Sequence, residues 1–267
     1  KFALMWANHT WQDIHPHKLH TEPPDLYPGP VRPGTFLTLT NYVIEQYFSH
    51  TSYWLINESP YFSIYSLNDL LESFGGVEET KEALQDFRIR TRKAGFYDLH
   101  LNAVVWGRQV LPGQEKPVDP NWLMNELGFD SVTSYVWIHH VPLKEFPQTD
   151  YRYVRECYLQ YYREAEETFD VPYFPNVTMG WDSSPRTVQS DRFINAGYPF
   201  TPVIANNTPQ EFRKSLLAVT QQLNQRTDTP KIFNINCWNE WTEGSYLEPD
   251  IHHGMEYLQA IKEVCGK

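Results

Sequence analysis

The stretch that does most to define this chain is Ile235-Asn-Cys-Trp-Asn-Glu-Trp-Thr-Glu-Gly-Ser-Tyr-Leu-Glu-Pro-Asp250. It begins in an apolar run typical of a buried strand and continues into three glutamates and an aspartate, interleaved with aromatic rings. Burying a carboxylate costs free energy, whereas burying an aromatic ring gains it, so a segment dense in both usually forms the wall of a cleft. Paired carboxylates beside aromatic rings are also the groups that cleavage of a glycosidic bond requires.

Working outward from this stretch, apolar runs of strand length alternate with longer amphipathic segments. The expected strands, rich in β-branched or aromatic residues, are Phe2–Trp6, Tyr61–Tyr65, Asp98–Val105, Ser131–Val136, Val171–Thr178, Phe200–Ala205 and Ile232–Cys237. The expected helices are Thr38–Ser49, Gly76–Ala94, Tyr151–Phe169, Pro209–Asn224 and His253–Val264. Strands that alternate with helices predict an α/β fold with a parallel sheet.

The number of strand and helix pairs favours a (β/α)8 TIM barrel over a doubly wound sheet. No Gly-x-Gly-x-x-Gly turn follows any expected strand, so the dinucleotide-binding version of the doubly wound fold has no support. The chain supplies fewer than eight strands, and it opens directly on a strand at residues 1–6. We therefore expect residues 1–267 to form a single catalytic barrel domain that lacks its N-terminal strands, the C-terminal portion of a longer barrel.

Active sites of such barrels lie at the C-terminal ends of the strands. Nearly every expected strand of this chain ends in an aromatic residue and a polar one. The predicted substrate-binding residues at these positions are Trp6, Asn8, Trp11, Tyr65, Trp106, Trp181, Asp182, Arg186, Trp238, Asn239, Trp241 and Tyr246.

Glu240 and Glu243 are the predicted catalytic residues. They stand three positions apart just after a strand, so their side chains share one face if the chain turns helical there. The alternative is a solvated acidic turn, but the flanking Trp238 and Trp241 would be costly on an open surface. Glu248 and Asp250 are expected to support neighbouring groups or to cap the last helix.

Two interpretations of Asp182 and Arg186 stay open. In one, Asp182 binds sugar hydroxyls and Arg186 holds its orientation. In the other, the two form an ion pair that pins the turn before Pro185.

Composition and charge exclude several classes of function. The chain of 267 residues has a net charge of -11, which argues against a nucleic-acid partner because phosphate binding needs clustered lysine and arginine. No apolar stretch approaches the roughly 20 residues of a membrane span. No targeting segment fixes the compartment, and we expect a periplasmic or secreted location rather than a cytoplasmic one.

No metal or other cofactor is expected. The three cysteines match no zinc pattern. The histidines His15, His17 and His20 lie in a proline-rich segment without a helix or strand to fix them as ligands.

The motif Trp238–Asp250, the segment Trp181–Arg186 and the opening Trp6–Trp11 together resemble the WbsX-type family, which is similar to glycoside hydrolase family 99. The chain departs from the usual opening at His9, where glutamate is common. WbsX-type proteins occur in bacterial polysaccharide gene clusters and were first described as glycosyltransferases. The resemblance to family 99 implies a (β/α)8 barrel and a hydrolase that acts on an oligosaccharide or polysaccharide.

The resemblance also implies a mechanism with retention at an α-linked sugar. Glu240 matches the glutamate thought to deprotonate the sugar 2-hydroxyl, which then attacks the anomeric carbon. Glu243 matches the general acid and base. We therefore predict a retaining glycoside hydrolase; the alternatives are a glycosyltransferase of polysaccharide biosynthesis and a non-catalytic carbohydrate-binding barrel.

Overall fold

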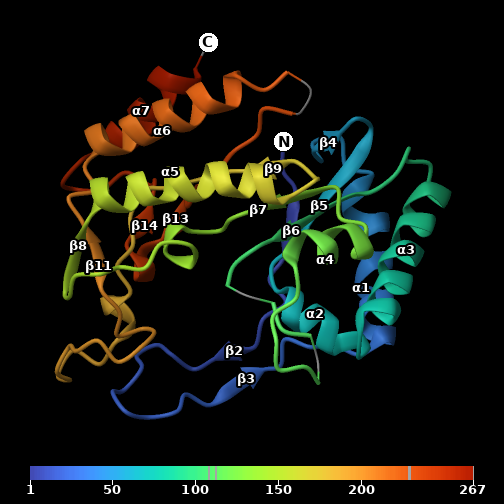
Figure 1. The fold of residues 1–267 in the computed structure, drawn as a ribbon, viewed down its shortest axis with the longest axis horizontal. Helices are drawn as coiled ribbons and strands as arrows, with labels where there is room; N and C mark the ends of the chain where they lie inside the picture. The colour runs from blue at the N-terminus through green and yellow to red at the C-terminus, as the bar shows by residue number, and fades with distance from the viewer. Residues whose placement is uncertain (108, 112, 228–229, 267) are drawn as a thin grey trace. The chain divides into compact units, whose positions relative to one another are not determined.

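The computed structural model describes residues 1–107, 109–111, 113–227 and 230–266. These residues form an α/β fold with mostly parallel strands and seven α-helices (Figure 1). The predicted α/β class with parallel strands is confirmed, and closure into an eight-stranded barrel stays a prediction. No helix of the described ranges has both the length and the apolarity needed to cross a bilayer.

The chain divides into two compact units that alternate along the sequence, and the expectation of a single catalytic domain is not tested by this division. Unit 1 consists of Lys1–Trp11, Leu26–Thr133 and Glu166–Tyr173. Unit 2 consists of Gln12–Asp25, Ser134–Ala165 and Phe174–Lys267. Two short strands, β2 (Trp11–Gln12) and β3 (Asp25–Tyr27), lie where the chain passes from one unit to the other.

Unit 1 is built on a parallel sheet. Its strands, in the order in which they pair, are β1 (Leu4–Trp6), β5 (Ser59–Ile64), β6 (His100–Val104) and β7 (Ser131–Thr133). The short β4 (Leu55–Ile56) pairs with β5 in the antiparallel sense, and β9 (Tyr173–Phe174) follows β7. Every residue of β5 is buried, as expected for a strand that lies between two others in a parallel sheet.

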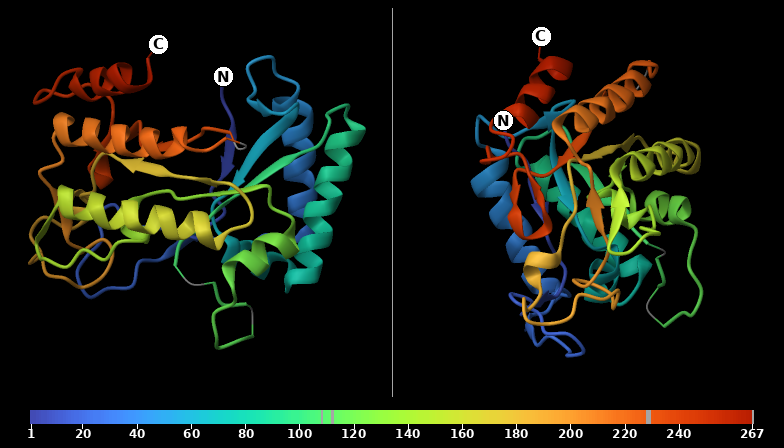
Figure 2. Two further views of the ribbon diagram at one scale, coloured as in Figure 1. Left: turned by 45° about the horizontal axis from the view of Figure 1, so that its top comes forward. Right: turned by 90° about the vertical axis from the view of Figure 1, so that its left-hand side faces the viewer.

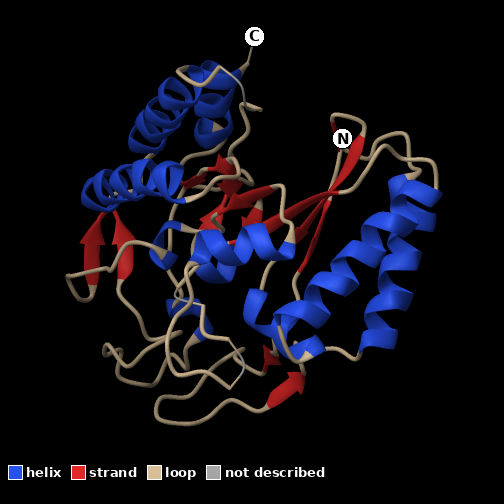
Figure 3. Cartoon of the chain, turned by 45° about the vertical axis from the view of Figure 1, so that its right-hand side comes forward, coloured by secondary structure: helices blue, strands red, loops and turns tan. Residues whose placement is uncertain are grey.

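The helices of unit 1 are α1 (Pro33–Val43), α2 (Leu67–Phe74), α3 (Val77–Lys93) and α4 (Pro120–Leu127). Figure 3 shows α1 and α3 as neighbouring blue helices on one side of the strands. Phe87 of α3 is fully buried, and its ring meets those of Phe36, Phe48 and Phe62 at centroid distances of 6.1, 6.0 and 5.4 Å. Edge-on and offset ring contacts of this kind make a well-packed aromatic core.

Unit 2 contains two parallel strand pairs and a hairpin. The strands β10 (Asn176–Thr178) and β12 (Asn234–Asn236) pair, as do β8 (Gln148–Asp150) and β11 (Val203–Ala205). The hairpin joins β13 (Asn239–Glu240) to β14 (Ser245–Tyr246). The long helices are α5 (Tyr151–Thr168), α6 (Pro209–Asn224) and α7 (Glu256–Cys265), and Figure 2 shows α6 in orange beside α7 in red.

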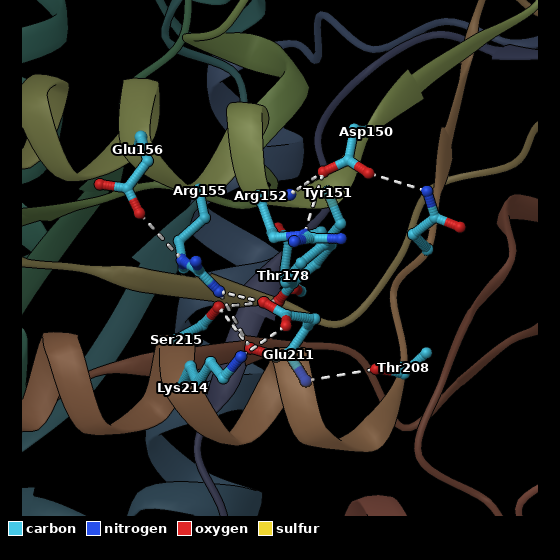
Figure 4. Close-up of polar contacts among 11 residues, drawn as sticks. Asp150, Tyr151, Arg152, Arg155, Glu156, Thr178, Thr208, Glu211, Lys214 and Ser215 are labelled. Atoms are coloured by element: carbon cyan, nitrogen blue, oxygen red, sulfur yellow. Dashed lines mark hydrogen bonds and ion pairs between the residues drawn. The ribbon is translucent and has the colours of Figure 1, made fainter.

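A polar network fixes α6 against α5 (Figure 4). Glu211 in the first turn of α6 accepts from Arg155 of α5 at 2.7 Å and from Lys214 at 2.7 Å. Tyr151 of α5 is fully buried and donates through its hydroxyl to the carbonyl of Thr178 at 2.7 Å. These contacts tie both helices to β10 and so hold the strand ends of unit 2 in place.

Most predicted elements are observed, with shorter strands. The predicted run over residues 171–178 is two strands rather than one, because Pro175 has no N–H for the ladder. The short helices α2 and α4 lack enough turns for a clear periodic pattern. Their ends do carry capping signals: Ser66 and Asp119 accept the N–H groups of Asp69 and Trp122.

Candidate active site

The predicted catalytic stretch folds as a tight hairpin at the end of β12. The hairpin consists of β13 and β14, and a single 3-10 turn, Trp241–Glu243, connects them. Glu240 immediately precedes this turn and Glu243 ends it. The expectation that a helical turn brings the two glutamates together is therefore confirmed for a 3-10 turn rather than an α-helix.

One arginine binds both glutamates. Arg186 lies in a separate 3-10 turn, Ser184–Arg186, which follows β10. Its Nη2 is 2.9 Å from Oε1 of Glu240, and its Nη1 is 2.9 Å from Oε1 of Glu243. Because the two nitrogens belong to one planar guanidinium, the two carboxylates are held at a fixed separation of a few ångströms.

Two further side chains complete this cluster. Thr242 accepts from Nε of Arg186 at 3.0 Å and donates to Oε1 of Glu240 at 3.0 Å. Tyr198 donates its hydroxyl to Oε1 of Glu243 at 3.2 Å and also contacts Arg186. The Glu240 side chain is 38% exposed and that of Glu243 is 11% exposed, so the two carboxylates meet different surroundings.

The electrostatics favour a proton on Glu243. Burial raises the pKa of the Glu243 carboxyl, and this outweighs the opposing charge of Arg186; the nearby Glu240 raises it further. Burial and the adjacent Glu243 also raise the pKa of the Tyr198 hydroxyl, which therefore stays protonated and able to donate.

Backbone contacts hold the hairpin against the segment that follows β10. The N–H of Asp182 donates to the carbonyl of Glu243 at 2.6 Å. Gly244 has a φ of +59°, and a Cβ there would lie 2.7 Å from the Cβ of Asp182. Only glycine combines this left-handed backbone with so close an approach.

The hairpin also carries an aromatic platform. The rings of Trp241 and Tyr246 stack at 3.7 Å between centroids with 15° between their planes. The indole N–H of Trp241 donates to Oε2 of Glu248 at 2.7 Å. Trp241 remains 44% exposed, so a rigid aromatic face stands in solvent beside the two carboxylates.

The structure brings together the predicted site residues of unit 2, with two corrections. Arg186 contacts the glutamates and not Asp182, whose Oδ1 instead accepts from the N–H of Ser184 at 2.9 Å. The Asp182–Arg186 ion pair, one of the two interpretations left open, is not observed, because Arg186 binds the two glutamates and Asp182 closes its own turn. Trp181 is only 4% exposed and therefore packs inside the unit. The expectation that Trp238 and Trp241 avoid an open surface is wrong, because they are 52% and 44% exposed.

Unit 1 holds the remaining predicted residues as a group of its own. Asn8 is buried and exchanges hydrogen bonds with the backbone of Ser66, at 2.7 and 2.8 Å, so its amide is committed to the fold. Trp106 donates its indole N–H to the carbonyl of Tyr65 at 3.2 Å, and their rings lie 5.8 Å apart.

The backbone N–H of Tyr65 in turn donates to the carbonyl of Trp6 at 3.1 Å. Trp11 is 54% exposed. Substrate contact by the unit 1 residues stays a prediction.

Sequence reasoning missed Tyr198 and Thr242. Tyr198 lies in the loop that leads into β11, and no local pattern marks it. Thr242 lies between the two glutamates, and its position was itself a signal, because a hydroxyl inside such a turn can reach both neighbours. Within the described residues, no three His, Cys, Asp or Glu side chains are grouped so as to hold a metal ion.

Residues 1–261 match the model of the family described as glycosyltransferase WbsX, and the chain belongs to this family. The curated relatives include the uncharacterized protein WxcX of Xanthomonas campestris pv. campestris, from strains B100 and ATCC 33913. Each is 23% identical over 282 residues, which cover 100% of this chain and 35% of the relative. The chain thus spans about a third of the length of these relatives.

Among solved structures, the chain is similar to the GH99 endo-alpha-mannosidase from Bacteroides thetaiotaomicron. The complex with Bis-Tris propane aligns with a TM-score of 0.48 and 15% identity, over 82% of this chain and 56% of that one. A second structure of the enzyme aligns with a TM-score of 0.46 and 16% identity, over 82% and 53%.

Proposed function

We propose that this chain carries the catalytic carboxylate pair of a retaining glycoside hydrolase that cleaves α-linked glycans. The observation that carries the proposal is the binding of Glu240 and Glu243 to adjacent nitrogens of Arg186. Retaining glycosidases hold their carboxyl groups roughly 5 Å apart, whereas inverting enzymes keep them further apart to admit a water. Two carboxylates that bind adjacent nitrogens of one guanidinium lie close enough together to act on the same glycosidic bond.

The two glutamates have the unequal surroundings that acid and base roles need. Glu243 is mostly buried and its pKa is raised, which favours the protonated form that a donor to the leaving oxygen needs. Glu240 is more exposed and is held by Arg186 and Thr242. In the mechanism implied by the family resemblance, Glu240 takes the proton of the sugar 2-hydroxyl, and that oxygen attacks the anomeric carbon.

The departing sugar leaves as an alcohol once Glu243 has protonated its glycosidic oxygen. Glu243, now a carboxylate, then takes a proton from a water that attacks the anomeric carbon. As the bond between that carbon and the 2-oxygen breaks, Glu240 returns its proton to the 2-oxygen. The two steps together consume one water and restore both glutamates. An axial 2-hydroxyl opposite the leaving group, as in α-mannosides and α-rhamnosides, suits this course.

The aromatic platform supports a glycan substrate. Sugar rings present apolar C–H faces that stack on aromatic side chains. The stacked pair of Trp241 and Tyr246 offers such a face on the same hairpin as both glutamates.

A second candidate is a glycosyltransferase of polysaccharide biosynthesis, which the name of the family favours. The sequence contains no Asp-x-Asp motif or glycine-rich phosphate loop of the kind that sugar-nucleotide enzymes often use. The same carboxylates could still serve transfer to a sugar acceptor in place of water. We rank this second because a carboxylate pair beside an aromatic platform suits cleavage of a glycosidic bond better than binding of a diphosphate.

The test is digestion of a panel of α-linked glycans by the full-length protein, beside Glu240→Gln and Glu243→Gln, with products followed by mass and anomeric configuration. A parallel series adds sugar nucleotides and glycan acceptors. Cleavage with retained configuration that disappears in both variants supports the hydrolase. Product formation only with a sugar nucleotide supports the transferase, and tight binding with no product in either series supports a non-catalytic carbohydrate-binding protein.

A further inference from the structure

A pocket inside unit 2 is lined in part by the catalytic hairpin. Its volume is about 300 Å³, at the lower end of the ~300–1,000 Å³ range typical of small-ligand sites. Its walls come from the segment after β11, from the hairpin and from the loop before α7. This volume suits one sugar ring rather than a longer segment of glycan.

The pocket shares two residues with the catalytic hairpin. Gly244 and Tyr246 both line it. Gly244 directly follows Glu243, and Tyr246 is one half of the aromatic platform. The aromatic platform and the pocket therefore share the side chain of Tyr246.

Hydrogen bonds within the unit preorganise the pocket. The side chain of Asn207 donates to the carbonyl of Met179 at 3.1 Å, and the hydroxyl of Tyr257 donates to the carbonyl of Asn207. The N–H of Tyr246 donates to the sulfur of Met179 at 3.1 Å. Asn206 donates from its side chain to Asp150 at 2.7 Å. Since these groups are fixed before a ligand arrives, little ordering cost remains for binding.

The chemistry of the lining matches an uncharged, hydroxyl-rich ring. The lining side chains are amides, hydroxyls, imidazoles, a thioether and aromatic rings, and none is an aspartate, glutamate, lysine or arginine. Just behind the lining, Asp250 accepts from the backbone N–H groups of His252 and His253, and Asp150 holds Asn206. These two carboxylates disfavour an anionic ligand. Imidazoles, amides and hydroxyls both donate and accept, as sugar hydroxyls do.

We propose that this pocket is a subsite for a neutral sugar ring, next to the ring held at Glu240 and Glu243. The inference rests on the proposed function and deepens it, because an additional subsite makes the substrate an oligosaccharide rather than a single glycoside. His252 and His253 contribute side chains to the subsite, and neither belongs to the catalytic cluster.

The test measures binding without turnover. Titration calorimetry measures the affinity of the Glu243→Gln protein for α-mannosides and α-rhamnosides of one, two and three sugar rings. The same series is repeated with His252→Ala and His253→Ala added singly, and with His15→Ala as the control. His15 is an exposed histidine of the same unit outside the pocket. Thermal unfolding of each variant establishes that it is folded.

We expect affinity to rise about tenfold on adding the ring that enters the pocket. Removing either imidazole should reduce that gain roughly fivefold, the effect of one hydrogen bond, with no change for the first ring or in the control. Equal affinities across the series, or a gain that both folded histidine variants retain, would overturn the subsite. If the wild type cleaves none of the glycans but the affinity still rises with the added ring, the hydrolase proposal is contradicted and the subsite proposal is supported.

Discussion

Arg186 and Glu243 form an ion pair of 2.9 Å, and the same guanidinium is bound to Glu240 at the same distance. The cluster thus contains two carboxylates and one permanent positive charge. Adding one proton to the three side chains makes their net charge zero, which favours a partly buried cluster. The more buried carboxylate is the one whose protonated form burial favours. The arginine therefore holds the pair together and still leaves Glu243 with the raised pKa that the proposed acid role needs.

Replacing Arg186 should change the pH dependence of activity. Arg186 lowers the pKa of Glu243, so Arg186→Met should raise that pKa further and move the alkaline limb of the profile to higher pH. The sign follows because Glu243 must be protonated to act as the acid, and a higher pKa keeps it protonated longer. We expect kcat/KM to fall about 100-fold as well, from lost positioning of both carboxylates.

Arg186→Lys is the matched control. It keeps the charge but cannot span both carboxylates with two adjacent nitrogens. We expect the alkaline limb to stay near its original pH while kcat/KM still falls. A pH profile of kcat/KM for the three proteins decides the point, and an alkaline limb that does not move in Arg186→Met would contradict the electrostatic role.

Gly244→Ala should be strongly destabilising. The added Cβ meets the Cβ of Asp182 at 2.7 Å, and φ is +59°. We expect the free energy of unfolding to fall by about 3 kcal/mol or more, combining backbone strain with overpacking. Gly254→Ala is the control, because Gly254 has a φ of +53° with open space around it and should show only the strain, about 1–2 kcal/mol. Equal losses in urea unfolding would show that the close approach contributes nothing.

Glu248 should act on glycan binding through Trp241. Its carboxylate accepts the indole N–H and fixes the plane of the exposed ring. We expect Glu248→Ala to weaken oligosaccharide binding about fivefold, with the free energy of unfolding changed by less than about 1 kcal/mol. Glu248→Gln keeps an acceptor and should restore most of the affinity. Equal oligosaccharide affinities for Glu248→Ala and Glu248→Gln would contradict a role of Glu248 in orienting Trp241.

Two neighbouring histidines should make the protein sensitive to acid. Burial lowers the pKa of His139 to about 4 and that of His140 to about 3, from an ordinary 6.5. Both side chains stay neutral in the folded protein down to about those pH values, whereas in the unfolded chain they take up protons below about pH 6.5. The free energy of unfolding is therefore highest above about pH 6.5 and falls as the pH is lowered, because protons bind preferentially to the unfolded chain.

His140→Phe removes one of these titrations. We expect the loss of unfolding free energy between pH 6.5 and pH 4 to shrink by roughly 2 kcal/mol relative to the wild type. The Phe ring can still stack on Tyr161, which lies 3.9 Å from the His140 ring. Urea unfolding at several pH values gives the change of the unfolding free energy with pH. If this change were the same in the variant and the wild type, His140 would take up its proton equally well in the folded state.

The sequence predicted the elements with strong patterns and the residues that follow them. The helix over Pro209–Asn224 has its predicted bounds, because Thr208 caps it and Pro209 fits its first turn. Glu240 and Glu243 were found because a dense acidic and aromatic segment directly follows a strand. Their separation of three residues was enough to predict a shared face.

What the sequence did not predict depends on contacts distant along the chain. Arg186 is more than 50 residues from either glutamate, and a closer carboxylate, Asp182, was the obvious partner by local spacing. Tyr198 reaches Glu243 from a loop that has no pattern of its own. Trp181 sits after a strand like the other aromatic residues, but the packing of unit 2 buries it. Tertiary packing, which local spacing does not encode, decided all three.

The most direct test of the central claim compares leaving groups in two variants. Glu243→Gln and Glu240→Gln are assayed by kcat/KM on an α-glycoside with an alkyl leaving group and on one with a dinitrophenyl group, which needs no protonation to depart. We predict that Glu243→Gln loses about 1,000-fold or more on the alkyl glycoside but keeps much of its activity on the dinitrophenyl one, while Glu240→Gln loses both. Equal losses on both substrates in Glu243→Gln, or wild-type rates in either variant, would contradict the assignment of acid and base to this pair.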